Sequence, residues 1–143
     1  MSQIIRDITE IARCGAQYKA DRLAPMGLKG CHASYLTEIC AHPGISQDQL
    51  AKRICINKSN VARQAATLEE EGFVTRTPSA TDKRIMELHP TQKTLDLLPQ
   101  IDRIMDSWQE MLTQDLSEDE QVMLERMLGQ LLRRASIYME EEA

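Results

Sequence analysis

The feature that most constrains the fold of this chain is a pair of short helical segments joined by a very short turn. Ser46, with Gln49 three residues later, forms the capping-box pattern that starts a helix, and this helix is expected to end near Ile54. Asn57 is a favourable N-cap for a second helix, which we expect to end before Gly72. So short a connection predicts that the two helices pack against each other as a helix-turn-helix.

Two short β-type runs follow the second helix, at residues 73–76 and 84–88. The segment between them, residues 77–83, is polar and rich in turn-forming residues. The two runs are therefore expected to pair as a hairpin. A hairpin that directly follows a helix-turn-helix predicts the winged helix-turn-helix arrangement.

Three longer amphipathic segments flank this region, at residues 4–18, 95–116 and 122–139. A chain of 143 residues forms one domain and cannot bury three such stripes on one small core, so a second copy is expected to cover them. The predicted fold class is mainly α (α+β). It is a single domain of residues 1–143, with a winged helix-turn-helix lobe in 29–90 and dimerisation helices in 1–28 and 91–143.

Charge is unevenly distributed along the chain. The net charge is −5, which excludes a polycationic protein, and residues 91–143 carry most of the acidity. From Lys52 to Arg63, however, there are four cations and no acid. This local excess of positive charge coincides with the turn and the start of the second helix, which favours binding of a polyanion there.

The start of the second helix is free to enter a major groove of DNA, where the base edges can be distinguished. Arg63 can donate two hydrogen bonds to guanine, and Asn60 or Gln64 can pair with adenine. An ordinary solvated helix face is the alternative. The residues expected to read DNA are Lys58, Ser59, Asn60, Arg63 and Gln64, which makes residues 29–90 the expected DNA-binding lobe.

The loop of the hairpin contains Asp82, Lys83 and Arg84. Arg84 is the candidate for insertion into a narrow minor groove, whose negative potential attracts arginine, and Asp82 would hold its guanidinium. A surface ion pair without a role is the alternative. Phosphate oxygens are expected to be bound by four further residues, Ser46, Gln47, Lys52 and Arg76.

These residues resemble a known family. The stretch 45–61 is similar to the winged-helix core of MarR-type (multiple antibiotic resistance) regulators, and residues 68–76 and the wing pattern D-x-R at 82–84 match as well. The resemblance covers essentially the full length, and Cys55 departs from it where glycine is common. It implies a homodimer that binds pseudo-palindromic double-stranded operator DNA, usually as a repressor, and that often releases the DNA when a small anionic or phenolic effector binds.

The cysteines and the N-terminus predict a reduced, cytoplasmic protein. The four cysteines show no C-x-x-C pair, no signal-peptide stretch is visible, and no apolar run is long enough for a membrane helix. Cys14 lies in the first helix, where a thiol sensor is one interpretation and a buried structural cysteine the other. No metal site is expected, because Cys31 and Cys40 fall on nearly opposite faces of one helix.

No enzyme and no cofactor are expected. The three histidines are scattered, and neither a G-x-S-x-G motif nor a phosphate-binding glycine loop occurs. Tyr35 could line an effector pocket at the junction of the helices and the lobe, although a core position is the simpler interpretation. Two other functions stay open: a thiol-based redox-sensing regulator of the same fold, and a winged-helix module that binds protein instead of DNA.

Overall fold

The computed structural model describes residues 2–142, and at its centre is a helix-turn-helix in which a side chain caps each helix. Helix α3 (Gln47–Ile54) begins at Ser46, whose hydroxyl accepts a hydrogen bond from the Gln49 backbone N–H at 3.0 Å, while the Gln49 side chain accepts one from the Ser46 N–H at 3.1 Å. Helix α4 (Lys58–Glu70) begins at Asn57, whose side chain accepts from the Asn60 N–H at 2.8 Å. Both predicted caps are confirmed.

The turn between these helices depends on an unusual backbone conformation at Cys55. Its φ is +56°, in the left-handed region that favours glycine. The Cys55 and Ile56 N–H groups both donate to the Ala51 carbonyl and so close α3. Ala51 and Val61 are buried, so α3 and α4 pack closely despite the cysteine.

The sheet has three antiparallel strands in the order β1-β3-β2. They are β1 (Ile45–Ser46), β2 (Val74–Pro78) and β3 (Met86–Pro90). The last two begin later than the predicted runs, because the Phe73 N–H is used to close α4 on the Leu68 carbonyl and the Arg84 N–H donates to Asp82 inside the loop. The sequence did not reveal β1, since two residues are too few to show an alternation.

Helix α2 (His32–Ala41) begins only after the chain has passed close to α1. Gly30 passes so close to α1 that a Cβ there would lie 3.0 Å from the Ala16 carbonyl oxygen. The His32 ring then accepts a hydrogen bond from the Lys29 N–H at 3.1 Å, next to the first turn of α2. The approach to α1 and this side-chain contact delay the helix.

The core lies between α2, α3, α4, the sheet and the first half of α5 (Gln92–Thr113). The buried Thr94 hydroxyl donates to the Phe73 carbonyl at 2.6 Å, which fixes α5 to the start of β2. The largest apolar side chains with no or almost no exposure are Tyr35, Phe73, Leu23, Leu36, Ile39, Leu50, Leu68, Leu88 and Ile101.

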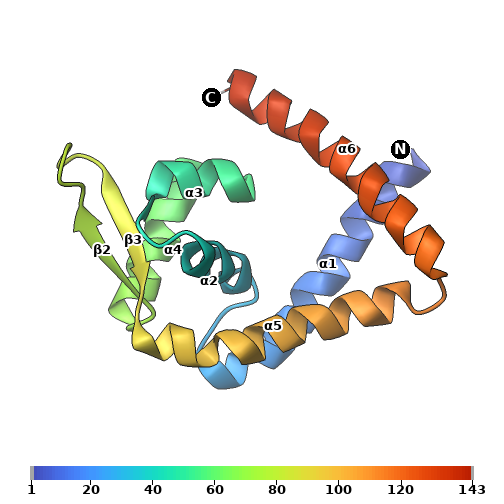
Figure 1. Cartoon of the computed structure of the whole chain (residues 1–143), viewed down its shortest axis with the longest axis horizontal. Coiled ribbons are helices and arrows are strands. Elements are labelled where there is room, and N and C mark those ends of the chain that lie inside the picture. Colours follow the sequence, from blue (N-terminus) through green and yellow to red (C-terminus); the bar gives the residue numbers. More distant parts are fainter. Residues whose placement is uncertain (1, 143) are drawn as a thin grey trace.

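Three long helices extend beyond this core (Figure 1). They are α1 (Gln3–Leu23), which continues into the short 3-10 helix η1 (Ala24–Met26), α5, and α6 (Glu118–Glu142). Helix α1 packs on α5 where Gly15 leaves room for Trp108, because a Cβ at this glycine would lie 3.0 Å from the indole nitrogen. The Trp108 ring also stacks on Tyr18, with the ring centroids 4.9 Å apart. A capping box formed by Ser117 and Glu120 starts α6.

The apolar stripes of these helices remain largely uncovered within one chain. Ile4 is 65% exposed, Val122 67% and Leu132 59%. The other large apolar side chains exposed on α1, α5 and α6 are Ile5, Ile8, Ile11, Leu95, Met111, Leu112, Met123, Met127, Leu128, Leu131, Ile137, Tyr138 and Met139. Among the described residues, no helix combines the length and apolar character needed to cross a membrane.

Candidate nucleic-acid interface

The first turns of α4 present polar side chains to solvent. Lys58, Ser59 and Arg63 are exposed, and Asn60 is half-buried. Arg63 lies one helical turn beyond Asn60, and its guanidinium contacts the Asn60 side-chain oxygen at 3.5 Å, which is long for a hydrogen bond. Both side chains therefore share one face of the helix and remain free to bind another partner.

Gln64, which was expected to read DNA as well, does not share the solvent-facing side of α4 with these residues. Its side-chain oxygen lies 2.9 Å from His32 Nε2, and His32 itself is only 1% exposed. The opposite ring nitrogen of His32 accepts from the Lys29 N–H, so Nε2 carries the proton and donates to Gln64. Gln64 adjoins the buried stripe of α4, which includes Val61 and Ala65, and helical periodicity could have indicated this inward position.

The tip of the hairpin is organised by the predicted contact between Asp82 and Arg84. One carboxylate oxygen accepts from the Arg84 backbone N–H at 3.0 Å and from its Nε at 3.1 Å, and the other accepts from Nη2 at 3.0 Å. These hydrogen bonds lower the pKa of Asp82 and raise the pKa of Arg84. The Arg84 side chain is nevertheless 89% exposed, and Lys83 beside it is exposed too, so the tip offers two cations to a ligand.

Two of the expected phosphate ligands are instead bound to each other. Arg76 forms an ion pair with Glu69 at 3.2 Å, and its Nη1 donates to the Gln47 side chain at 3.4 Å. The Arg76 backbone N–H also donates to Glu69, at 3.0 Å. These contacts connect β2, α4 and α3, which gives Arg76 and Gln47 a structural role.

The remaining expected phosphate ligands, Ser46 and Lys52, differ in how available their side chains are to a phosphate. Lys52 is exposed, while the Ser46 hydroxyl already accepts a hydrogen bond within its own capping box. Lys58 lies 3.7 Å from Asp48, and because both side chains are more than 60% exposed this pair is weak. Lys52 and Lys58 are therefore the cations beside α4 that are most available to a phosphate.

The exposure of Cys14 corrects one expectation. Cys14 is exposed in this chain, as are Cys31 and Cys55, so the interpretation of Cys14 as a buried structural cysteine is wrong. Its neighbour Gly15 faces Trp108, and Cys14 is turned away from that contact. Within residues 2–142, no cluster of three or more His, Cys, Asp or Glu side chains suited to a metal ion is present.

Tyr35 is a core residue, as the simpler interpretation held. It is 1% exposed and packs edge-on against the His32 ring, with the centroids 6.4 Å apart. Its buried hydroxyl has no hydrogen-bond partner among the described residues, and burial raises the pKa of Tyr35.

A capped helix with an exposed polar start, packed on a second helix and flanked by a hairpin with a cationic tip, defines the winged helix-turn-helix class of DNA-binding proteins. Residues 32–86 match the model of the MarR family. The HTH-type transcriptional regulator YybA of Bacillus subtilis is 32% identical over 103 residues, which cover 72% of this chain and 69% of YybA. The chain belongs to the MarR family of transcriptional regulators, which are transcription factors and not enzymes.

Solved structures agree with this assignment over nearly the whole chain. The transcriptional regulator SlyA superposes with a TM-score of 0.94 at 29% identity, covering 99% of this chain and 100% of that one. A MarR family transcriptional regulator from Listeria monocytogenes, complexed with 26mer DNA, superposes with a TM-score of 0.92 at 26% identity and covers 97% and 93% of the two chains. The predicted winged helix-turn-helix with flanking long helices is confirmed.

The buried contact between His32 and Gln64 predicts a pH-dependent stability. Burial lowers the pKa of His32, while in the unfolded chain it returns to its ordinary value of about 6.5. Between these two pKa values the unfolded chain binds more protons, so the free energy of unfolding should fall as the pH is lowered from 7 to 5. Urea unfolding at fixed protein concentration measures this slope, which His32→Gln should reduce.

His42→Gln, a change at an exposed position, is the matched control and should keep the slope of the natural protein. Parallel curves for the natural protein and His32→Gln would contradict the assignment of this pH dependence to His32.

Proposed function

We propose that this protein is a homodimeric repressor that binds pseudo-palindromic operator DNA and releases it when a small effector binds. The observation that carries the proposal is the exposed start of α4, with Lys58, Asn60 and Arg63 beside a wing that ends in Arg84. The DNA-bound relative from Listeria monocytogenes supports the choice of duplex DNA as the ligand.

In the proposed complex the residues have distinct tasks. Arg63 and Asn60 contact base edges in the major groove, since each has donors that match a purine edge. Lys52 and Lys58 contact phosphates, and these contacts supply affinity with little sequence preference. Arg84 and Lys83 follow the adjacent minor groove, with Asp82 fixing the Arg84 guanidinium.

The second half of the proposal concerns the dimer. The apolar side chains exposed on α1 and α6 form far more uncovered apolar surface than isolated residues would, and a second copy is the partner that a symmetric oligomer supplies. A two-fold axis then places two copies of α4 on one face of the dimer. Successive major grooves lie about 34–36 Å apart, so the proposed dimer holds the two helices at that separation.

Repression and release follow from this arrangement. A dimer bound over a promoter excludes other proteins from it, and an effector weakens the complex only by the difference between its affinities for the free and the DNA-bound protein. We place this action in the cytoplasm, since exposed thiols such as those of Cys14 and Cys55 suit a reducing compartment.

The DNA interface is tested by two substitutions in α4, measured by fluorescence anisotropy on an operator selected from random duplexes. Arg63→Ala should lose about 1–3 kcal/mol of discrimination at one base pair of each half-site, because a bidentate base contact is removed. Lys58→Gln should weaken binding to all sequences alike and reduce the salt slope by about one for each subunit.

Arg103→Gln is the control for Lys58→Gln, because it removes the same charge at an exposed site on α5. If Arg103→Gln lowers affinity and salt slope as much as Lys58→Gln does, binding depends on net charge and the interface is misplaced.

The dimer is tested by placing a charge on the apolar stripe of α6. The natural protein should sediment as two chains at micromolar concentration, and Leu131→Glu should sediment as one, because burial of an unpaired carboxylate is unfavourable. Gln130→Glu adds the same charge to the neighbouring position and should leave the dimer intact. A Leu131→Glu protein that remains dimeric would exclude this stripe as the interface.

A further inference from the structure

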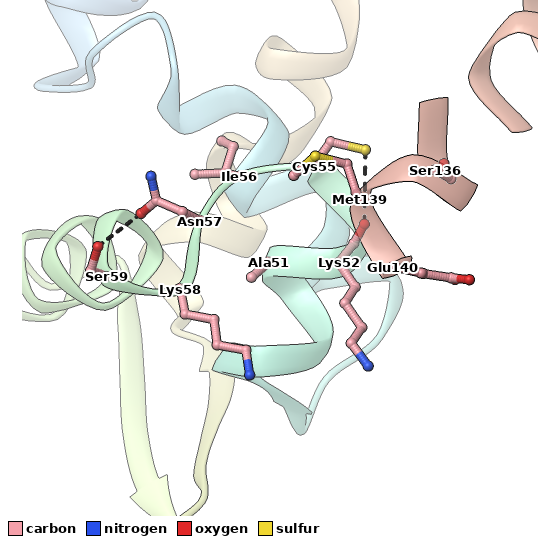
Figure 2. A pocket seen from close by; sticks show the side chains of 10 residues that line it. All are labelled: Ala51, Lys52, Cys55, Ile56, Asn57, Lys58, Ser59, Ser136, Met139 and Glu140. Atoms are coloured by element: carbon pink, nitrogen blue, oxygen red, sulfur yellow. Dashed lines mark hydrogen bonds between the residues drawn. The ribbon is translucent and has the colours of Figure 1, made fainter. Parts of the chain in front are cut away.

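The polar side chains in the first turns of α4 differ in what they already bind. Ser59 donates its hydroxyl to the side-chain oxygen of the cap Asn57 at 2.9 Å (Figure 2). The amide and guanidinium groups that suit base edges follow in the next turn, on Asn60, Arg63 and Gln64. The base that each of them reads depends on which of its atoms are left free by contacts within the protein.

The buried ring of His32 fixes the orientation of one of these amides. Its Nδ1 accepts a hydrogen bond from the Lys29 backbone N–H at 3.1 Å, so the ring proton is on Nε2. A ring N–H can only donate, and its partner 2.9 Å away is therefore the oxygen of the Gln64 amide. A second proton on Nδ1 would leave Nε2 a donor, so the neutral and the charged ring hold the amide in the same orientation.

The nitrogen of the same amide is left free. Within residues 2–142 the Gln64 amide makes one hydrogen bond, through its oxygen. Gln64 is half-buried, and the Tyr35 hydroxyl is the only buried side-chain nitrogen or oxygen of these residues without a partner, so the Gln64 nitrogen reaches solvent. Helical geometry places Gln64 about 40° around α4 from Asn60, at the border of the solvent-facing side. Gln64 therefore turns its oxygen to the core and its two N–H donors outward.

An amide that offers donors without an acceptor selects among the bases. A glutamine that is free to turn pairs with adenine by donating to N7 and accepting from the N6 amino group. The Gln64 oxygen is held by His32, so it does not reach that amino group. Guanine presents two neighbouring acceptors in the major groove, N7 and O6, and both match an N–H donor. Cytosine presents an amino group, which leaves the Gln64 donors without a partner.

We propose that His32 is a positioning residue for base recognition, which holds Gln64 so that it reads guanine and not adenine. The inference rests on the proposed function in one respect, that α4 enters the major groove of DNA. It differs from the expectation that Gln64 pairs with adenine, and it leaves that base to Asn60. His32 thereby acts on sequence specificity without touching DNA.

Nitrogen-15 NMR of the free protein tests the premise without DNA. The shifts of the His32 ring should show a protonated Nε2 and an unprotonated Nδ1 above neutral pH, and His32→Gln, which lacks the ring, assigns the signals. The opposite tautomer would overturn the proposal, because Gln64 would then turn its nitrogen to the ring and its oxygen to the groove.

Selection of binding sites from random duplexes tests the reading of the base. One base pair in each half-site should lose its preference in Gln64→Met, which has a similar length and no donor. At that pair the natural protein should bind guanine about tenfold more tightly than adenine, as expected for one matched pair of hydrogen bonds. His32→Phe keeps a buried ring without the donor and frees the amide, so guanine and adenine should then bind about equally well.

His32→Gln is the matched control for His32→Phe. Its amide N–H lies near the position of Nε2 and should restore the preference for guanine. Both variants lose the ring nitrogen that accepts from Lys29, so they differ in the donor to Gln64. The base pair that responds to Arg63→Ala is an internal control, and its preference should be the same in the natural protein and in both His32 variants.

Gln64→Glu tests the same contact from the other side, and it decides the question if circular dichroism shows that His32→Phe does not fold. The carboxylate accepts from His32 and offers the groove an acceptor, so the preference should change from guanine to cytosine. The ratio is measured within one protein, so a general loss of affinity from the added negative charge cancels.

Several results would overturn the proposal. They are a lack of any base pair that responds to Gln64→Met, a preference for adenine at that pair, a preference for guanine retained in His32→Phe or in Gln64→Glu, and a folded His32→Gln that behaves as His32→Phe does. A natural protein that selects no operator would contradict the proposed function instead, and the tautomer of His32 is measured independently of that outcome.

Discussion

The position of the first turn of α4 is the constraint on which the rest of the structure depends. It is fixed from both directions, by the left-handed backbone of Cys55 that closes α3 and by the Asn57 side chain that caps α4. Burial of Ala51 and Val61 then holds the two helices together. Because the turn is so short, the first turn of α4 is held at the surface, and its polar side chains are exposed to solvent.

Polar contacts from the later turns of α4 also hold this helix in place. Glu69 binds Arg76 of β2, and Arg76 in turn reaches Gln47 of α3, so side-chain contacts connect the wing to both helices. Gln64 binds the buried His32 at the start of α2, which follows directly on the segment that leaves α1. The first turns of α4 are thereby connected, through α2, to the segment that leaves α1.

Most of the architecture could be predicted from the sequence because the relevant signals are local. The capping boxes at Ser46 and Ser117, the Asn57 cap and the stop at Gly72 are readable in a few residues, and each is present in the structure. What could not be predicted depends on contacts between distant segments. The Arg76–Glu69 pair and the inward position of Gln64 both require knowledge of which elements meet.

Hydroxyl-radical footprinting of the protein on a selected operator tests the central claim most directly. Two copies of the chain that hold their α4 helices at the pitch of DNA should protect two patches of backbone, centred about one helical turn apart and related by the symmetry of the sequence. A single protected patch, with one chain bound to each duplex, would contradict the account.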